Sequence, residues 1–225
     1  MSIDPWPLFS LELRTPRLKL HPVRDADLGG LAAAALAGIH EIGRSPFPST
    51  WAQAPADLLP AEYARFHWKQ RAGITRESWH VAFAVVESGT VIGCQDIVAE
   101  AFAATRTLTS GSWLTRSAQG RGLGREMRAA VLLLAFDHLG AEVAESAALA
   151  WNTRSIRVSE ALGYRTNGTS RIVGSDGAGV EEVRFRVTPE TFVRPEWPLE
   201  VSGVDAARTM LVENSARLPR NPPPG

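Results

Sequence analysis

The alternation of hydrophobic and polar positions divides the chain into two halves of different character. In the first half, residues 17–22 alternate apolar and polar side chains, and two β-branched, apolar runs cover residues 79–86 and 90–98. Such runs are typical of strands, and the short polar stretch at residues 87–89 is typical of a hairpin turn. With a further strand over residues 108–115, this half predicts an antiparallel meander.

Two helices are predicted within the first half. An alanine-rich helix begins at Asp25, whose carboxylate favours a helix start, and runs to Leu36. A second helix is predicted over residues 57–73, where the apolar positions recur at helical spacing. Residues 43–55 between them contain several prolines and are predicted to form a loop.

After residue 122 the pattern changes to helices that alternate with strands. The sequence predicts helices over residues 123–138 and 152–162, and strands over residues 142–147, 165–173 and 181–187. A strand, helix and strand in succession place their two strands side by side and parallel. The predicted fold class is therefore α/β, with a mixed and mostly antiparallel twisted sheet, one parallel pair and helices on both faces.

The length of 225 residues suits one domain with additions at both ends. We expect an N-terminal extension over residues 1–12, the domain itself over 13–190 and a C-terminal appendage over 191–212. Residues 213–225 are expected to be disordered, because proline is frequent there and apolar residues are scarce. Within the appendage, residues 199–212 fit a strand and a short helix that would pack against a second subunit of a homodimer.

The composition excludes several classes of partner. Lys and Arg total 24, as do Asp and Glu, so no net charge attracts nucleic acid or an anionic membrane. No apolar run is long enough to span a bilayer, and histidine and cysteine spacings show no metal site. The single cysteine, Cys94, lies in an apolar run and is expected to be buried and reduced. These features predict a soluble, cytoplasmic protein.

One stretch combines glycine and arginine at the start of a predicted helix. Glycine permits a positive φ and a close ligand approach, while the first N–H groups of a helix lack intrahelical partners. The helix dipole and two arginines add positive charge, so the stretch predicts a pyrophosphate site. The alternative is a glycine-rich turn before an ordinary core helix. The residues are Gln119, Gly120, Arg121, Gly122, Leu123, Gly124 and Arg125.

Two common phosphate-binding motifs do not fit this stretch. The dinucleotide fingerprint needs G-x-G-x-x-G, whereas the glycines here are Gly120, Gly122 and Gly124. The P-loop needs Gly-Lys followed by Ser or Thr, whereas Gly124 is followed by Arg125 and Glu126. Both mismatches argue against a nucleotide-binding enzyme.

A third signature, Gln/Arg-x-x-Gly-x-Gly/Ala, does fit, and it is that of the GNAT family of acyl-CoA-dependent N-acyltransferases. The matching residues, with those that follow in the family's spacing, are Gln119, Gly122, Gly124, Asn152, Ser155, Val158, Gly163 and Tyr164. The chain resembles the RimJ/RimL-type branch over residues 14–188, and residues 110–131 resemble its actinobacterial members. The resemblance implies the GNAT fold, in which the parallel strands splay apart and pantetheine lies in the wedge.

The resemblance also implies the co-substrate, acetyl-CoA or a larger acyl-CoA such as succinyl-CoA, bound by residues 119–125 without a metal. Backbone groups of Trp113 and Leu114 would hold the pantetheine arm and polarise the thioester carbonyl. The amide of Asn152 would bond the same arm.

Many relatives carry a tyrosine seven residues after that asparagine, which protonates the leaving thiolate, but this chain has Ser159 there. Ser155 matches a serine that RimJ/RimL-type enzymes present near the sulfur. It could equally be a surface serine bonded to its own helix. Tyr164 occupies an aromatic position that the family packs in the core.

The amine acceptor must lose a proton on attack, which calls for a general base. The acidic position of some relatives is Thr109 here, so Glu145 and Asp96 are the candidate bases, on strands expected to flank the acceptor. Each could instead be a solvated residue on the sheet, and water could relay the proton.

The acceptor and acyl groups would contact Phe47, Trp51, His67 and His80, of which the first three lie in the segment that lines the acceptor pocket in the family. A succinyl donor would add a carboxylate that needs a cation or hydrogen-bond donors, and the candidates are His80, Arg106 and the backbone of the loop from Phe47 to Trp51. The sequence thus predicts acyl transfer by direct attack of an amine of a protein N-terminus, a lysine or a small molecule. The alternative is a catalytically weak acyl-CoA-binding or sensing module.

Overall fold

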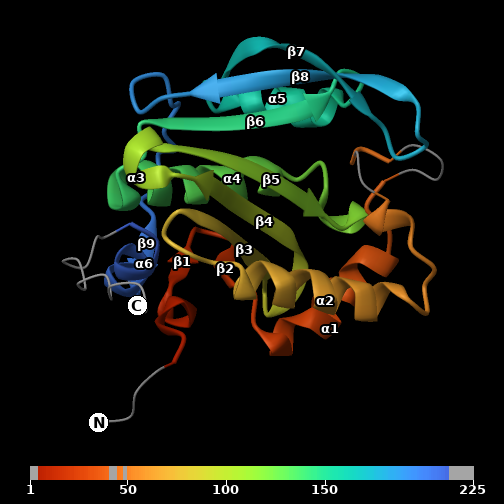
Figure 1. Cartoon of the computed structure of the whole chain (residues 1–225), viewed down its shortest axis with the longest axis horizontal. Coiled ribbons are helices and arrows are strands. Elements are labelled where there is room, and N and C mark those ends of the chain that lie inside the picture. The colour runs from red at the N-terminus through yellow and green to blue at the C-terminus, as the bar shows by residue number, and fades with distance from the viewer. Residues whose placement is uncertain (1–4, 41–44, 48–49, 213–225) are drawn as a thin grey trace, which may run out of the picture.

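The structure is a computed structural model, and it describes residues 5–40, 45–47 and 50–212 (Figure 1). The predicted tail over residues 213–225 and parts of the loop at 43–55 therefore lie outside the described residues. None of the described helices is long and apolar enough to cross a membrane.

A single nine-stranded sheet forms the centre of the molecule, in the order β7-β8-β6-β5-β4-β3-β2-β1-β9. All neighbouring strands are antiparallel except β5 and β6, which are parallel. This arrangement confirms the predicted mixed α/β fold. The strands are β1 (Glu12–Arg14), β2 (Lys19–Pro22), β3 (Ser78–Glu87), β4 (Thr90–Glu100), β5 (Thr107–Leu114), β6 (Val143–Leu149), β7 (Arg165–Val173), β8 (Gly179–Val187) and β9 (Glu200–Ser202).

Helices lie on both faces of the sheet, with α1 and α2 on one face and α4 and α5 on the other (Figure 1). The last helical turns of the predicted 123–138 helix are a π-helix, η4 (Leu134–Leu139), that continues α4. The remaining helices are α1 (Asp25–Leu36), α2 (Leu59–Ala72), α3 (Phe102–Thr105), α4 (Leu123–Leu133), α5 (Thr153–Ala161), α6 (Val204–Leu211) and the short 3-10 turns η1 (Pro7–Ser10), η2 (Trp51–Gln53) and η3 (Arg116–Ala118).

Two hydrophobic clusters fill the spaces on either side of the sheet. Alternate residues of β3 face opposite sides, because side chains of a strand alternate in direction. Phe83 and Val85 pack in the larger cluster, beneath α4, whereas Ala82 and Ala84 pack in the smaller one, beneath α1 and α2. Cys94 belongs to the smaller cluster and is buried, as its sequence context predicts.

The predicted strand over residues 17–22 corresponds to β2, which forms an antiparallel hairpin with β1. The Thr15 hydroxyl closes the turn between them by accepting the Leu18 N–H at 3.0 Å. A side chain that mimics a backbone turn in this way is common for threonine.

The C-terminal strand and helix pack on this same chain. Strand β9 pairs with β1 at the edge of the sheet, and Ala207 and Leu211 of α6 are buried in the larger cluster. The predicted secondary structure of residues 199–212 is thus present. Within this chain, β9 contacts β1, and α6 contacts η1 and η4. The predicted homodimer contact of this segment stays a prediction.

The parallel contact between β5 and β6 is short. Only residues 107–109 of β5 pair with residues 143–145 of β6. Strand β5 continues to Leu114 and β6 to Leu149, so the backbone ladder does not extend into the carboxyl halves of the two strands. We call the space between these unpaired halves the seam.

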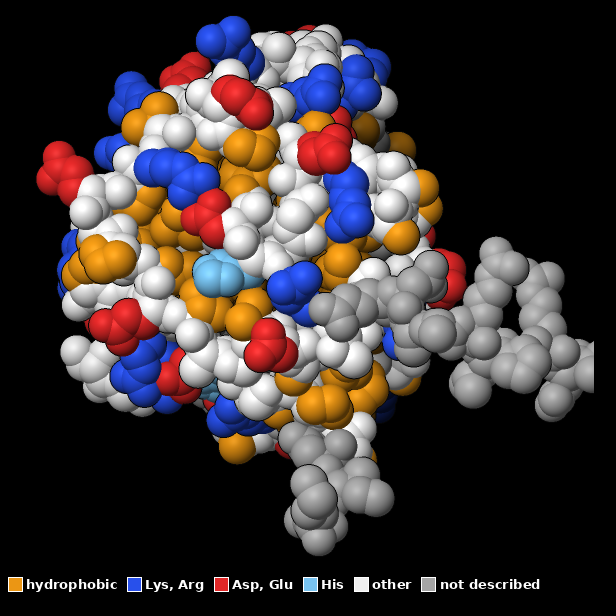
Figure 2. Space-filling model, turned by 90° about the vertical axis from the view of Figure 1, so that its left-hand side faces the viewer, with side chains coloured by type: hydrophobic (Ala, Val, Ile, Leu, Met, Phe, Trp, Pro, Cys, Tyr) orange, Lys and Arg blue, Asp and Glu red, His pale blue; other side chains and the backbone are white. Residues whose placement is uncertain are grey.

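The end of the molecule that carries α3 and the start of β5 is away from the seam. Figure 2 shows this end, where acidic and basic side chains are intermixed with hydrophobic ones. This view therefore shows no large surface of a single charge sign.

Candidate functional site

The loop before α4 presents a row of free backbone donors. Gly120 and Gly122 have φ of 74° and 81°, a left-handed conformation that glycine adopts without strain. This geometry leaves the N–H groups of residues 120–124 without an acceptor among the described residues, whereas those of Arg125 and Glu126 bond the Gly122 carbonyl. Five free N–H groups at the positive end of a helix are suited to bind phosphate oxygens.

Gln119 fixes the loop in place. Its Nε2 donates to the carbonyl oxygens of Leu114 at 2.8 Å and Ile39 at 2.6 Å, and its Oε1 accepts from Arg154 at 3.2 Å. The side chain therefore ties the end of β5, the segment after α1 and the start of α5 together. Gln119 therefore holds the loop in position, and the polar atoms of its side chain are already hydrogen-bonded.

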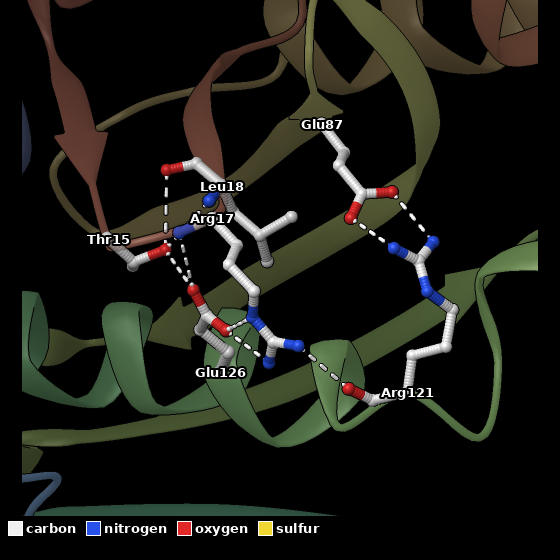
Figure 3. A network of polar contacts seen from close by, with 6 residues as sticks. All are labelled: Thr15, Arg17, Leu18, Glu87, Arg121 and Glu126. Carbon is white, nitrogen blue, oxygen red and sulfur yellow. Dashed lines mark hydrogen bonds and ion pairs between the residues drawn. The ribbon is translucent and has the colours of Figure 1, made fainter.

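A buried carboxylate holds the first turn of α4. Glu126 is only 6% exposed, and it accepts from the Thr15 hydroxyl at 2.6 Å, the Arg17 N–H at 3.0 Å and Arg17 Nε at 2.6 Å (Figure 3). Arg17 also donates to the carbonyl oxygen of Arg121 at 2.9 Å. The connection between β1 and β2 thus anchors the loop, and Arg17 balances a negative charge that would otherwise oppose an anion.

The two arginines of the loop differ in their surroundings. Arg121 forms two hydrogen bonds with Glu87, at the end of β3, whose oxygens lie 2.7 and 2.8 Å from the guanidinium (Figure 3). Arg125 is exposed and has no polar partner among the described residues. Arg125 is therefore the loop cation that can reach a ligand without first breaking an ion pair.

The end of β5 lies between the loop and the seam. Trp113 and Leu114 are both buried, at 8% and 6% exposure. The Trp113 ring packs against Trp51 and Tyr63, with centroids 5.7 and 6.2 Å away, on the face covered by α1 and α2. The predicted pantetheine-binding residues therefore lie at the end of the unpaired half of β5.

Asn152 and Ser155 are together at the start of α5, across the seam from β5. The Asn152 side chain caps the helix, because its Oδ1 accepts the Ser155 N–H at 3.3 Å. Its amide nitrogen remains available to a ligand. The Ser155 hydroxyl is half-buried and has no hydrogen bond to another described residue.

A histidine and a carboxylate meet on the face of the sheet below α2. His80 Nε2 lies 2.8 Å from Asp96 Oδ2, so β3 and β4 bring together two residues that the sequence suggested for separate roles. Asp96 also lies over Gly111 of β5, where an added Cβ would be 2.8 Å from Oδ1. Gly111 is thus needed for the carboxylate to sit over the unpaired half of β5.

Glu145 occupies a different place, at the last residue pair of the parallel ladder. It is opposite Thr109 of β5 and Arg186 of β8 and is half-buried. Both candidate bases therefore flank β5, but Asp96 is the one whose side chain contacts a histidine.

The predicted acceptor residues form an aromatic wall beside this pair. The Trp51 ring centroid lies 5.2 Å from that of Phe47 and 5.5 Å from that of Tyr63, and His67 stacks edge-on against Tyr63 at 4.5 Å. His67 is buried with Nε2 unpartnered, and burial lowers its pKa from 6.5 to about 4. His67 is thus neutral at pH 7.

Burial also raises the pKa of Tyr63 and of Cys94 well above their usual values, and the nearby Asp96 adds to the effect on Cys94. A neutral, buried thiol is a poor nucleophile. Cys94 therefore contributes to packing and does not suit a covalent acyl carrier.

Arg106, suggested as a cation for a succinyl group, lies elsewhere. It follows α3 at the amino end of β5, where its carbonyl accepts the Glu142 N–H at 2.8 Å and its guanidinium covers the Phe102 ring. The carboxyl end of β5 is at the other end of the strand, so Arg106 is not placed to contact an acyl group in the seam.

Several site residues were missed by sequence reasoning. Tyr63 lies in the predicted helix over residues 57–73 but was not named as a site residue, and the contact between Arg17 and Glu126 joins residues 109 positions apart. A buried arginine of α4, Arg128, was also not singled out. The available signal was that Glu126 and Arg128 are charged residues in a largely apolar helix, where a charge that becomes buried needs partners.

Comparison with known proteins supplies the observation that decides the family. A sequence model described as "Acetyltransferase (GNAT) domain" matches residues 17–165, which is more than half of the chain. The chain belongs to the GNAT acetyltransferase family. Members of this family are acyl-CoA-dependent N-acyltransferases, and this assignment agrees with the loop, the parallel pair and the seam.

Solved structures of the family share this fold. RimJ of Mycobacterium smegmatis, in complex with CoA disulfide, is 20% identical, with a TM-score of 0.64 over 91% of this chain and 97% of that one. A ribosomal-protein-S5-alanine acetyltransferase of Vibrio fischeri is 14% identical, with a TM-score of 0.63 over 83% and 98%. A GCN5-related N-acetyltransferase of Brucella melitensis is 21% identical, with a TM-score of 0.62 over 80% and 79%. At these identities the likeness concerns the fold alone.

Proposed function

We propose that this GNAT protein transfers an acyl group, acetyl in the first instance, from acyl-CoA to a primary amine by direct attack. One observation carries the proposal: the five free N–H groups of residues 120–124 stand beside the seam between β5 and β6. A molecule with a pyrophosphate at one end and a long polar arm at the other matches that combination.

In this arrangement the pyrophosphate of CoA binds the N–H groups of the loop, with Arg125 as an additional cation. The pantetheine arm enters the seam, and its amides bond backbone groups of Trp113 and Leu114 and the free amide nitrogen of Asn152. The thioester then lies next to α5 and β5, and the acyl group points toward the face of the sheet that carries His80 and Asp96.

The acceptor amine approaches from the aromatic wall formed by Phe47, Trp51 and Tyr63. Its nitrogen attacks the thioester carbonyl carbon, the C–S bond breaks, and its proton is taken by the His80–Asp96 pair directly or through water. Ser155 is placed to donate a hydrogen bond to the departing sulfur. The acceptor is an amine of a protein N-terminus, a lysine or a small molecule in the cytoplasm.

The choice between acetyl-CoA and succinyl-CoA depends on the surroundings of the acyl group, because the loop contacts only the part common to all donors. With Arg106 at the far end of β5, His80 is the side chain that remains on the acceptor face among those first suggested for a succinyl carboxylate. His80 is already paired with Asp96, whose carboxylate would repel that of a succinyl group. This arrangement supports acetyl-CoA as the preferred donor.

The test begins with calorimetry of CoA, ATP and NAD binding to the purified protein. CoA is expected to bind, and retention of ATP or NAD in its place would overturn the proposal. Acetyl-CoA and succinyl-CoA are then compared by release of free thiol, with acceptors that include peptides with different first residues, lysine and small amines. CoA binding without turnover over this panel would favour the acyl-CoA-binding or sensing module.

A further inference from the structure

Arg128 is a buried cation without a counter-charge. It lies in the second turn of α4 and is 5% exposed. Its Nη1 donates to the Ser159 hydroxyl at 3.0 Å and its Nη2 to the Ser112 hydroxyl at 3.2 Å, while Nε has no partner. No carboxylate among the described residues lies within ion-pair distance of it. A buried guanidinium is costly unless an anion accompanies it, so this arrangement is incomplete as it stands.

The surroundings of Arg128 are polar but uncharged. Beside Ser112 and Ser159, the buried hydroxyls of Ser110 and Tyr164 lie 3.5 Å apart, and Ser146 donates to the Ser110 carbonyl at 3.3 Å. The titratable groups that act on Arg128 from the elements around it are Tyr164, at the start of β7, and Asp96, on β4. Neither is an ion-pair partner of the guanidinium.

A second polar atom near Arg128 also lacks a partner. Gln95 of β4 is opposite Ser112 in the register of β4 and β5, so the two side chains are on the same face. Its Nε2 bonds two backbone carbonyls, but its Oε1 is buried without a donor. Two buried polar atoms close to Ser112, Gln95 Oε1 and Arg128 Nε, therefore lack a hydrogen-bond partner.

The position of Arg128 within the fold is the decisive point. Ser112 is on the unpaired half of β5, and Ser159 is on α5, which follows β6, so the guanidinium bridges the two sides of the seam. The arginine therefore occupies the neighbourhood where the sulfur of a bound acyl-CoA would lie.

We propose that Arg128 is a catalytic residue, whose guanidinium stabilises the CoA thiolate as the thioester breaks. This inference rests on the proposed function, because it needs acyl-CoA in the seam. The amine nitrogen forms its bond to the carbonyl carbon, the electron pair of the C–S bond passes to sulfur, and the amine proton leaves to the base. Arg128 stays protonated throughout, and the thiolate becomes the anion that it lacks.

A purely structural role predicts a different result. If Arg128 only linked β5 to α5, it would not favour the thiolate of bound CoA over the thiol. The thiol of bound CoA provides the distinguishing measurement. A cation within about 4–6 Å lowers the pKa of an acidic group by one to three units. We therefore expect the thiol of enzyme-bound CoA to titrate at least about one unit below that of free CoA.

The experiment follows the ultraviolet absorbance of the thiolate as a solution of the protein with CoA is titrated. Protein without CoA, which carries the one cysteine, is subtracted, and desulfo-CoA serves as a ligand without the thiol. If the bound thiol titrates like free CoA, the inference fails even though acyl transfer stands. If the wild-type protein binds no CoA, the proposed function fails as well.

The variant Arg128→Gln removes the charge and keeps a hydrogen-bond donor for the two serines. It should return the thiol titration toward that of free CoA and lower kcat about tenfold or more, while desulfo-CoA affinity changes little. Arg128→Lys, which keeps the charge, should retain part of the shift and covers the case in which the glutamine variant does not fold. Arg165→Gln removes an exposed arginine of β7 and should have no effect. An unaltered thiol titration in a folded Arg128→Gln protein would overturn the assignment.

Discussion

The guanidinium of Arg121 binds both carboxylate oxygens of Glu87, so the loop before α4 is tied to the turn between β3 and β4. In the geometry of the proposed site, this ion pair competes with the ligand for Arg121. The side chains of the pair are 50% and 18% exposed, and pairs of this kind contribute little to stability.

The first prediction concerns this competition. Glu87→Gln should strengthen CoA binding up to about fivefold at low salt, since it frees Arg121 from a pair that is worth at most about 1 kcal/mol. Calorimetry at two salt concentrations checks the result, and the gain should shrink as salt screens the charges. Glu142→Gln, at the other end of the sheet, is the matched control. Weaker binding would show instead that Glu87 orders the loop.

Gly122 supplies the second prediction. Its φ of 81° disfavours any side chain, and a β-branched residue would also crowd the anion site. Gly122→Val should therefore weaken CoA binding tenfold or more, about 1.4 kcal/mol. Gly177 has nearly the same φ, 79°, with open space around it in the turn between β7 and β8. Gly177→Val should show the same backbone strain in thermal unfolding and unchanged CoA affinity. Equal CoA affinity in the two variants would argue against the loop as the binding site.

The third prediction separates the two candidate bases. Asp96→Asn removes the charge that faces His80 and should lower kcat/KM on the order of 100-fold. Glu145→Gln, on the other side of β5, should have less than a threefold effect. Both variants are measured with acetyl-CoA and one verified amine. A larger loss in Glu145→Gln would move the base to β6.

The fourth prediction concerns Ser155, whose hydroxyl is free at the start of α5. Ser155→Ala should lower kcat by between about threefold and a hundredfold with little change in KM, because a hydrogen bond to a charged group contributes about 1.5–3 kcal/mol. The helix cap is unaffected, since it uses the Ser155 backbone N–H. Thr153→Ala, an exposed change in the same turn, is the control. A wild-type kcat under conditions where chemistry is rate-limiting would leave Ser155 with a structural role only.

The fifth prediction follows from the burial of His67. Its folded pKa of about 4 is below the unfolded value of 6.5, so the unfolded chain binds a proton more readily between these values. The free energy of unfolding should therefore fall as the pH decreases from 6.5 toward 4, by on the order of 3 kcal/mol from this group. His67→Leu should remove that part of the pH dependence in denaturant titrations. Identical slopes for the two proteins in this range would contradict the burial of a neutral His67.

The sequence predicted the order of elements well, because most of them are defined by local patterns. The hairpin of β3 and β4, the parallel crossover into β6 and the glycine-rich start of α4 all have signals within a few residues. The π-helical end of α4 and the turn closed by Thr15 were not predicted. Both depend on hydrogen bonds that residue type alone does not determine.

The site was predicted less completely, because its polar contacts join distant segments. Asp96 and His80 were named for separate roles, and only the register of β3 and β4 shows that they touch. Arg106 was named because it is close to β5 in sequence. It precedes the first residue of β5, however, and the whole length of the strand separates it from the site at the carboxyl end. Arg128 was hidden in an apolar helix, where its burial could not be seen without the packing of α5.

The pairing of β9 with β1 has a consequence for the far side of the molecule. Strand β1 ends at the turn whose Thr15 and Arg17 bind Glu126, and Glu126 sets the first turn of α4. The last described strand of the chain therefore braces the donor loop through β1, although it is nowhere near the loop in sequence. A chain cut after Glu190 would keep every residue of the loop and lose the brace behind it.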